Sequence, residues 1–310
     1  MARSETIRKL QRTLARNAFY LTRWLVSRLN HTTFRLLFAV LTAVGGPLIR
    51  PKKALARENL KLAFAGEKTE PDIERIADDC FHNFGKAMID LIWFIDRPHL
   101  ILEKVSIVGK EHLDRVLQDG KGAILVSAHF GNFILMYLRM VQEGYKTNVI
   151  MRRVRDRSFE KYISEFRAER GLRTIYDLPA RQCVQQSIKA LRNNELLFIL
   201  LDQNYGGAGG IFVDFFGRPS ATATGPVVFS TRIGSPILPA FIFHDGKDRH
   251  KIVIEPPLEL KKTPEDQATL VENVAGITKM IEGHIRRAPH EWGGWMHRRW
   301  KNQPQPAKDA

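Results

Sequence analysis

Hydrophobic residues along the chain fall into short unbroken runs and longer amphipathic stretches. An unbroken apolar run without polar alternation is typical of a strand buried on both faces of a sheet. Such runs predict central strands at residues 123–127 and 196–201, and further strands are predicted at residues 105–109, 147–151, 173–175, 237–243 and 250–255. Helical spacing predicts helices at residues 53–64, 72–94, 110–119, 133–140, 159–169, 180–192, 226–233 and 266–287, and residues 217–225 are predicted as a loop. Because strands and helices alternate, the predicted fold class is α/β, with a mostly parallel central sheet covered by helices.

The most apolar stretch, residues 32–49, precedes this pattern and carries one charge, Arg35. Its length is at the low end of what crosses a bilayer. We expect either one short anchor helix, with residues 53–64 returning the chain, or an interfacial amphipathic hairpin. A basic helix packed on its own domain is the third alternative. The predicted organisation is a membrane-associated helical segment at residues 1–64, an α/β domain at 65–303 and a frayed tail at 304–310.

Charge narrows the choice of partners. The 310-residue chain has a net charge of +15, and residues 1–61 hold thirteen Lys or Arg and two Asp or Glu, a net charge of +11. A basic excess beside an apolar segment favours an anionic membrane surface. Phosphorylated substrates and acidic proteins are other anionic partners. We expect no nucleic-acid partner, because no nucleic-acid motif accompanies the charge.

Few residues are placed to carry chemistry. His129 and Asp202 each follow a predicted central strand, so they would meet at one edge of the sheet if those strands are neighbours. A histidine base oriented by an aspartate can deprotonate an alcohol, and no serine or cysteine nucleophile is obvious beside them. Each residue could instead simply end its strand with a hydrogen bond. No zinc-type spacing, GxSxG elbow, phosphate loop or dinucleotide fingerprint is present, so no metal is predicted.

Several motifs together resemble the lipid A acyltransferases, the late lauroyl and myristoyl transferases, within the wider glycerolipid acyltransferase superfamily. The matching stretches are ILVSAHFGNF (124–133), ILLDQN (199–204), GIFVDFFGRPSATATGP (210–226), GSPILPAFI (234–242), IEPPLEL (254–260) and HEWGGWMHRRWK (290–301). The resemblance implies transfer of an acyl chain from acyl carrier protein to a hydroxyl of a lipid A precursor. It places the enzyme at the cytoplasmic face of the inner membrane, with His129 as general base and without a cofactor. A coenzyme A donor, and a lysophospholipid or another glycolipid as acceptor, stay open.

One position departs from the pattern of that family, which has Asp or Glu five residues after the histidine. Here this position is Ile134, and an isoleucine cannot orient an imidazole or stabilise its protonated form. Three explanations compete. Asp202 replaces the carboxylate, or Asn132 and backbone groups hold the imidazole, or the chain is a non-catalytic, membrane-bound lipid-binding homologue.

Basic and hydroxyl residues near the predicted site are candidates for substrate binding. Arginines after a strand end or an aromatic pair could bind phosphates or the acidic carrier, and residues at a loop-to-helix start could donate to a phosphate or an oxyanion. The candidates are Arg152, Arg153, Arg155, Arg218, Thr222, Thr224 and Gly225. Each arginine could also be a solvated surface charge. Trp292, Trp295 and Trp300, with Arg298, Arg299 and Lys301, resemble an interfacial belt; an aromatic corner of the core is the alternative.

Overall fold

The computed structural model describes residues 13, 17, 20–22, 24, 28–154, 156–207, 209–246, 248–261 and 267–302. Within these ranges, seven strands form one sheet in the order β1-β9-β8-β2-β5-β3-β4. The strands are β1 (Val105–Val108), β2 (Ala123–Ser127), β3 (Thr147–Met151), β4 (Leu172–Tyr176), β5 (Leu196–Leu200), β8 (Ile237–His244) and β9 (His250–Ile254). All neighbouring strands pair in parallel except β8 and β9, which are antiparallel. The predicted α/β class with a mostly parallel sheet is therefore confirmed.

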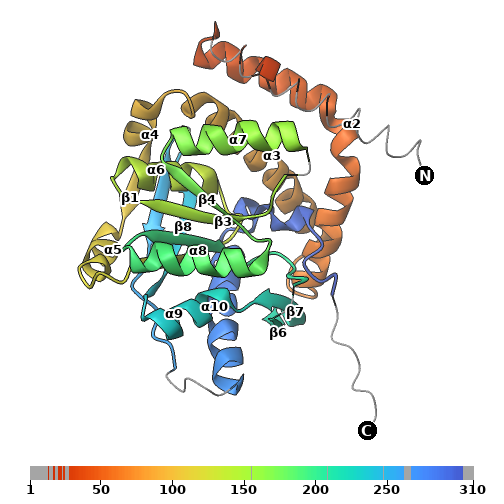
Figure 1. Cartoon of the computed structure of the whole chain (residues 1–310). Helices are drawn as coiled ribbons and strands as arrows, with labels where there is room; N and C mark the ends of the chain where they lie inside the picture. Colours follow the sequence, from red (N-terminus) through yellow and green to blue (C-terminus); the bar gives the residue numbers. More distant parts are fainter. Residues whose placement is uncertain are drawn as a thin grey trace.

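Helices cover the two faces of this sheet (Figure 1). Their bounds are α2 (His31–Ala63), α3 (Glu70–Phe94), α4 (Pro98–Lys104), α5 (Lys110–Leu117), α6 (Phe133–Gln142), α7 (Arg157–Glu169), α8 (Ala180–Arg192), α9 (Gly225–Ile233) and α10 (Gln267–Arg287), followed by the short 3-10 helices η1 (Pro289–Glu291) and η2 (Gly293–Met296). Short α4 was not predicted. The helices that were predicted between residues 70 and 287 are all present, with ends shifted by a few residues.

The alternation of side chains along β2 explains why two separate cores form. Ile124 and Val126 face a core built with α2, α8, α9 and α10, whereas Leu125 faces a second core built with α4, α5 and α6. α3 contributes to both cores, with Ile73 and Ile76 in the first and Trp93 in the second. Every residue of β2 is buried, as expected for a central strand covered on both faces.

The N-terminal segment is organised differently from the prediction. Residues 32–49 and 53–64 were expected as separate segments, but they form one continuous helix, α2, that contains Pro47 and Pro51. Figure 1 shows that α2 changes direction along its length, and internal prolines bend helices because they remove a donor and crowd the preceding turn. Its last turns pack into the main core through Ala56, Leu60 and Ala63.

Membrane crossing was one of the arrangements left open for this segment. Among the helices of the described ranges, none is both long and apolar enough to span a bilayer. Most of residues 1–27 and all of residues 303–310 lie outside the described residues. The predictions for the extreme N-terminus and for the tail at 304–310 therefore fall on residues that the structure does not describe.

The predicted loop at residues 217–225 is wrong. These residues form β7 (Arg218–Ala223), which pairs antiparallel with β6 (Gly210–Phe215). Ser220 and Thr222 of β7 are fully buried. Small polar residues resemble a loop in sequence, but here they fit a buried hairpin whose partner strand supplies the hydrogen bonds.

Candidate active site

The site lies at the carboxyl ends of two neighbouring strands. β2 and β5 pair in parallel, with Ser127 opposite Leu200, and Leu201 N–H donates to the Ser127 carbonyl just beyond the strands at 3.0 Å. His129 and Asp202 follow directly. The sequence analysis left open whether the two strands are neighbours; they are, and their pairing brings these two side chains to one edge of the sheet.

The turn after His129 has a strict steric requirement. Gly131 has a φ of +51°, and a Cβ there would lie 2.2 Å from the Ile242 carbonyl oxygen. Only glycine fits such a position. Two backbone bonds fasten this turn to the C-terminal segment, since Gly131 N–H donates to Glu291 O and Gly293 N–H donates to His129 O, both at 2.8 Å. The backbone around His129 is therefore fixed on both sides.

Asp202 is buried and holds the imidazole. Its Oδ1 lies 2.9 Å from His129 Nδ1, and its Oδ2 accepts from His129 N–H at 3.1 Å and from Trp292 Nε1 at 2.7 Å. The side chain of Asp202 is completely shielded from solvent, whereas that of His129 is 28% exposed. A carboxylate that accepts at Nδ1 fixes the proton on that nitrogen and leaves Nε2 able to accept one.

The same contacts shift both pKa values in the direction that keeps the pair charged. Burial acts to raise the pKa of Asp202, but the charge of His129 and hydrogen bonds from His129 and Trp292 lower it to about 2. Burial acts to lower the pKa of His129, but the charge and hydrogen bond of Asp202 raise it. Asp202 therefore stays ionised at neutral pH and can stabilise a protonated imidazole.

His129 opens into a pocket of about 690 Å³ between α2, α3, the start of α6 and the C-terminal segment. The walls are mostly apolar, and they include Ile49, Phe81, Phe84, Met88, Phe133 and Met296. Ile134 lines the same pocket. The residue at the position of the expected carboxylate therefore extends an apolar wall beside the histidine.

Two residues that the sequence analysis did not name as site residues lie near His129: Gln203 contacts the imidazole, and Arg299 holds the backbone of Gln203. The amide nitrogen of Gln203 lies 3.2 Å from His129 Nε2 and 3.4 Å from Nδ1. The buried Arg299 donates to the carbonyls of Gln203 and Ala221 at 2.9 and 2.6 Å, and burial lowers its pKa to about 10. In the sequence, Gln203 stood out only as the residue after Asp202 within the ILLDQN stretch (199–204).

The aromatic C-terminal segment forms a corner of the core rather than an interfacial belt. Trp292 and Trp295 are fully buried, with ring centroids 4.4 Å apart. Arg299 is 1% exposed, and Trp300 Nε1 donates to the Phe215 carbonyl at 3.2 Å. Arg298 and Lys301 are exposed. The indole of Trp292 is needed inside the molecule, because it is a donor to Asp202.

Asn132 does not contact the imidazole through any described hydrogen bond. It is 2% exposed, precedes the first turn of α6, and donates from Nδ2 to the Ala87 carbonyl of α3 at 2.8 Å. The second explanation for Ile134 required Asn132 to hold the imidazole. The side chain instead connects the start of α6 to α3, because its amide group bonds to the Ala87 carbonyl and not to His129.

The predicted substrate-binding arginines lie away from the pocket of His129. Exposed Arg152 pairs with Asp177 at 3.3 Å, and the Arg153 guanidinium stacks 4.2 Å from the ring centroid of Tyr176. Arg218 donates to the Leu62 carbonyl at 3.4 Å. Arg155 lies outside the described residues. None of the three described arginines lines the pocket.

The predicted hydroxyl and glycine donors are also separate from the pocket. Thr222 is buried, donates to the Ser220 carbonyl and accepts from Arg299, so both functions of its hydroxyl are occupied inside the fold. Thr224 donates to the Gly209 carbonyl at 3.0 Å. Gly225 begins α9. These residues build the β6–β7 hairpin and the start of α9, which the loop prediction did not foresee.

Potential metal ligands converge at another place. In the described part of the chain, Asp90, His244 and His250 bring three ligand atoms within 4.8 Å of one another. They come from α3, the end of β8 and the start of β9, which explains why their spacing in sequence gave no signal.

Comparison with known proteins identifies the family. Residues 1–302 match the family described as bacterial lipid A biosynthesis acyltransferase. The chain is 26% identical to the lipid A biosynthesis palmitoleoyltransferase of Escherichia coli K12 over 291 residues, 91% of this chain and 89% of the relative. It is 26% identical to the lauroyltransferase of the same strain over 290 residues, 91% and 90% of the two chains. A phosphatidylinositol mannoside acyltransferase of Mycobacterium tuberculosis CDC 1551 / Oshkosh is 26% identical over 142 residues, 46% of this chain and 45% of the relative. The predicted resemblance is thus confirmed: the chain belongs to the bacterial lipid A biosynthesis acyltransferases and is an acyltransferase.

Proposed function

We propose that this enzyme moves a fatty acyl chain from acyl carrier protein to a hydroxyl of a lipid A precursor or a related glycolipid, with His129 as general base and Asp202 as its carboxylate partner. The observation that carries the proposal is the 2.9 Å contact between Asp202 Oδ1 and His129 Nδ1 at the edge of an apolar pocket. Family membership supports acyl transfer, and the contact supplies the acid–base pair that Ile134 cannot.

In the proposed reaction, Nε2 of His129 takes the proton of the acceptor hydroxyl as the oxygen attacks the thioester carbonyl. The carbon–sulfur bond of the resulting tetrahedral intermediate then breaks. The thiolate takes the proton from the imidazolium, so the products are an ester and a free thiol. Asp202 stays ionised and stabilises the imidazolium without becoming protonated. Base catalysis of this type contributes roughly 10²- to 10⁴-fold to a rate.

The apolar pocket supports the acyl side of the proposal. A fatty acyl chain gains about 0.8 kcal/mol for each methylene buried, and the walls around His129 offer phenylalanine, methionine and isoleucine side chains. Ile134 belongs to this wall, so we propose that it contacts the acyl chain. On this view, an isoleucine at the position of the expected carboxylate is compatible with catalysis.

The acceptor is proposed from the relatives. Two relatives that match over most of their length are named for lipid A, and one that matches over less than half is named for phosphatidylinositol mannoside. Lipid A and phosphatidylinositol mannoside are both glycolipids. The net charge of +15 favours the acidic carrier protein over coenzyme A as donor. Exposed Arg152 and Arg153 are proposed contacts for substrate phosphates or the carrier. Thr224 and Gly225, at the start of α9, stay weaker candidates because the Thr224 hydroxyl already donates within the fold.

We propose that the enzyme acts at the cytoplasmic face of the inner membrane. The basic and apolar residues 1–64 would hold it on the anionic surface, with contact around residues 32–49, and residues 65–303 would form the acyltransferase domain. Thirteen Lys or Arg within residues 1–61 support this orientation.

The direct test offers purified, detergent-solubilised enzyme a mixture of acyl carrier proteins of different chain length together with a lipid A precursor. We expect a product heavier by one acyl chain, detected by mass spectrometry, and its mass identifies the chain. His129→Ala should lower the rate by at least about 10²-fold, with unchanged thermal unfolding as the control for folding. Near-wild-type turnover by that variant would contradict the proposed base. Binding of either substrate without product would favour the non-catalytic lipid-binding alternative, and transfer only to a lysophospholipid or only from coenzyme A would correct the substrates.

A further inference from the structure

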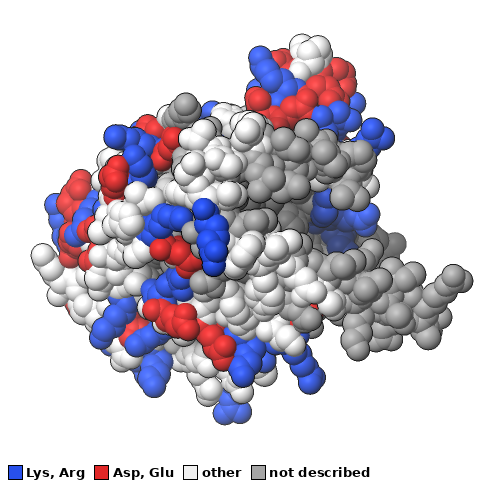
Figure 2. Space-filling model, turned by 90° about the horizontal axis from the view of Figure 1, so that it is seen from above, with Lys and Arg blue, Asp and Glu red and all other residues white. Residues whose placement is uncertain are grey.

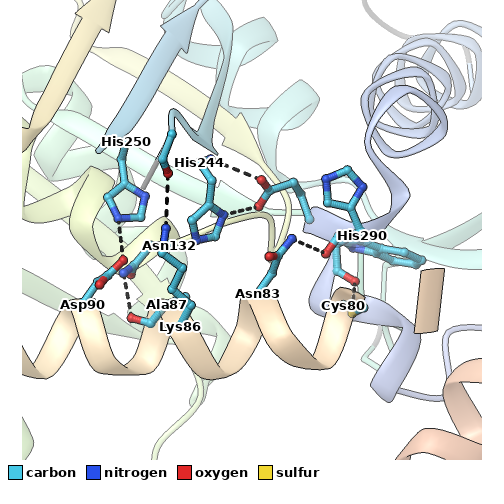
Figure 3. Close-up of polar contacts among 12 residues, drawn as sticks. Cys80, Asn83, Lys86, Ala87, Asp90, Asn132, His244, His250 and His290 are labelled. Atoms are coloured by element: carbon cyan, nitrogen blue, oxygen red, sulfur yellow. Dashed lines mark hydrogen bonds and ion pairs between the residues drawn. The ribbon is translucent and has the colours of Figure 1, made fainter. Parts of the chain in front are cut away.

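A cluster of two histidines and one aspartate lies at one wall of the catalytic pocket, which His244 lines. Asp90 comes from α3, His244 ends β8 and His250 begins β9 (Figure 3). Asp90 is 2% exposed and His250 is completely buried. The ligand atoms of all three lie within 4.8 Å of one another, although 154 positions separate Asp90 from His244 in the chain.

One nitrogen of each imidazole in this cluster has no hydrogen-bond partner in the described part of the chain. His250 Nε2 contacts Asp90 Oδ2 at 3.1 Å, and His244 Nδ1 contacts Glu291 Oε2 at 2.7 Å. The second nitrogen of each ring, His250 Nδ1 and His244 Nε2, is buried without a hydrogen-bond partner in the described part of the chain. Buried polar atoms in native proteins nearly always have a partner. Two unsatisfied nitrogens beside one carboxylate therefore require an explanation.

A metal ion provides that explanation. We propose that Asp90, His244 and His250 bind a divalent transition metal ion, with Zn²⁺ as the ion that best suits two imidazoles and one carboxylate. Ligand atoms of tetrahedral zinc lie about 2.0–2.2 Å from the ion, so small side-chain rotations close the present triangle around it. A water molecule would supply the fourth ligand.

The surroundings fit this role. Glu291 accepts at His244 Nδ1, which keeps the proton on that nitrogen and leaves Nε2 able to bind a metal ion, an arrangement that carboxylates commonly impose on zinc-ligating histidines. Glu291 and Asp90 together supply two negative charges. The amino group of Lys86 is the cation facing this region from α3, and it donates to the Gly246 carbonyl at 3.4 Å (Figure 3). Two carboxylates outweigh one ammonium, so the local charge favours a divalent cation.

The consequence of this site would be structural. The ion would join α3 to the β8–β9 hairpin, and both His244 and Glu291 line the pocket that contains His129. Metal binding would therefore stabilise one wall of the pocket without entering the acyl-transfer reaction. This inference stands independently of the proposed function, because it rests on residues outside the His129–Asp202 pair.

The experiment uses full-length, tag-free enzyme in detergent, stripped with a chelator and then titrated with Zn²⁺. We expect about one zinc ion per chain by mass spectrometry of the metal after gel filtration, and a rise in melting temperature that grows with zinc concentration. Co²⁺ as a probe should give the visible absorption of a low-symmetry site with nitrogen ligands. Asp90→Asn and His244→Gln should each weaken zinc binding by roughly 10-fold or more.

The matched control is His99→Gln, because His99 is an exposed histidine outside the cluster and should leave zinc binding unchanged. Wild-type enzyme that retains no zinc, or whose melting temperature does not respond to it, overturns the proposal and leaves Asp90 and His250 as a buried hydrogen-bonded pair. Equal zinc binding by wild type and both cluster variants also overturns it. The zinc titration of the wild-type enzyme is sufficient to test the proposal, so the test holds even if a variant fails to fold.

Discussion

Asp202 and His129 could be predicted from the sequence, because each follows an unbroken apolar run and parallel strands bring their carboxyl ends to one edge of a sheet. Their contact then depends on one fact of tertiary structure, the pairing of β2 with β5. The hydrogen-bond donors around the pair could not be predicted in the same way. Trp292 lies 90 positions from Asp202 in sequence, and the aromatic segment that contains it matched an interfacial belt equally well. Long-range hydrogen bonds leave no periodicity in the chain.

A substitution at Ile134 tests the role of this residue directly. We expect Ile134→Glu, which restores the pattern of the family, to give no increase in the acyl-transfer rate. Asp202 already occupies Nδ1 of the imidazole, and a carboxylate in an apolar wall would lose contact with the acyl chain. Initial rates for the variant and for Ile134→Leu, the apolar control, measure this. A several-fold faster Glu variant would mean that the wild-type site lacks a functional carboxylate.

Among the elements, most strands and amphipathic helices followed from local patterns, whereas short α4, the continuous helix α2 and strand β7 did not. Residues 32–49 and 53–64 were predicted as separate segments, yet α2 continues through Pro47 and Pro51, and its later turns are buried in the main core. Residues 217–225 were predicted as a loop because their glycine, proline and serine residues are typical of turns, yet residues 218–223 form β7 of the β6–β7 hairpin. In both cases tertiary packing overrides local propensity.

The attachment of α2 to the C-terminal segment gives a prediction at this scale. Asn59 Nδ2 donates to the carbonyls of Trp295 and His297, both at 2.8 Å, beside the pocket. Asn59→Ala leaves these carbonyls without their donor and should lower the free energy of unfolding by about 1–3 kcal/mol. Chemical denaturation measures the loss. The exposed neighbour substitution Glu58→Ala should change it by less than about 0.5 kcal/mol, and equal effects of the two substitutions would contradict the assigned contact.

At the scale of the whole molecule, Figure 2 shows how charged side chains are distributed on one face. Figure 2 shows basic and acidic side chains intermixed over the described part of that face, although the chain carries a net charge of +15. The asymmetry lies along the sequence, with +11 in residues 1–61. Composition predicted an anionic partner. It could not define a binding surface, because many cations in the folded domain pair with carboxylates, as Lys53 does with Asp78 and Arg173 with Glu195.

Membrane attachment through this segment predicts a salt-dependent interaction. Full-length enzyme should sediment with vesicles containing anionic phospholipid at low salt, and binding should weaken as salt is raised, because each Lys or Arg near the surface contributes about 1 kcal/mol. Neutral vesicles are the control. Equal binding to neutral and anionic vesicles at every salt concentration would contradict an electrostatic contribution. Retention on nucleic acid in the same buffer would restore the nucleic-acid alternative.

The most direct measurement is the pH dependence of acyl transfer by wild-type enzyme and Asp202→Asn. The base works only when His129 is neutral, so the rate should rise as pH passes through the pKa of His129, which the charge and hydrogen bond of Asp202 raise against the effect of burial. Removing that charge should move the acid limb to lower pH. It should also reduce the plateau on the order of 10²- to 10⁴-fold, because the imidazolium loses its stabilising partner. An unchanged plateau with an unmoved acid limb would contradict the assignment of Asp202 as the partner of His129.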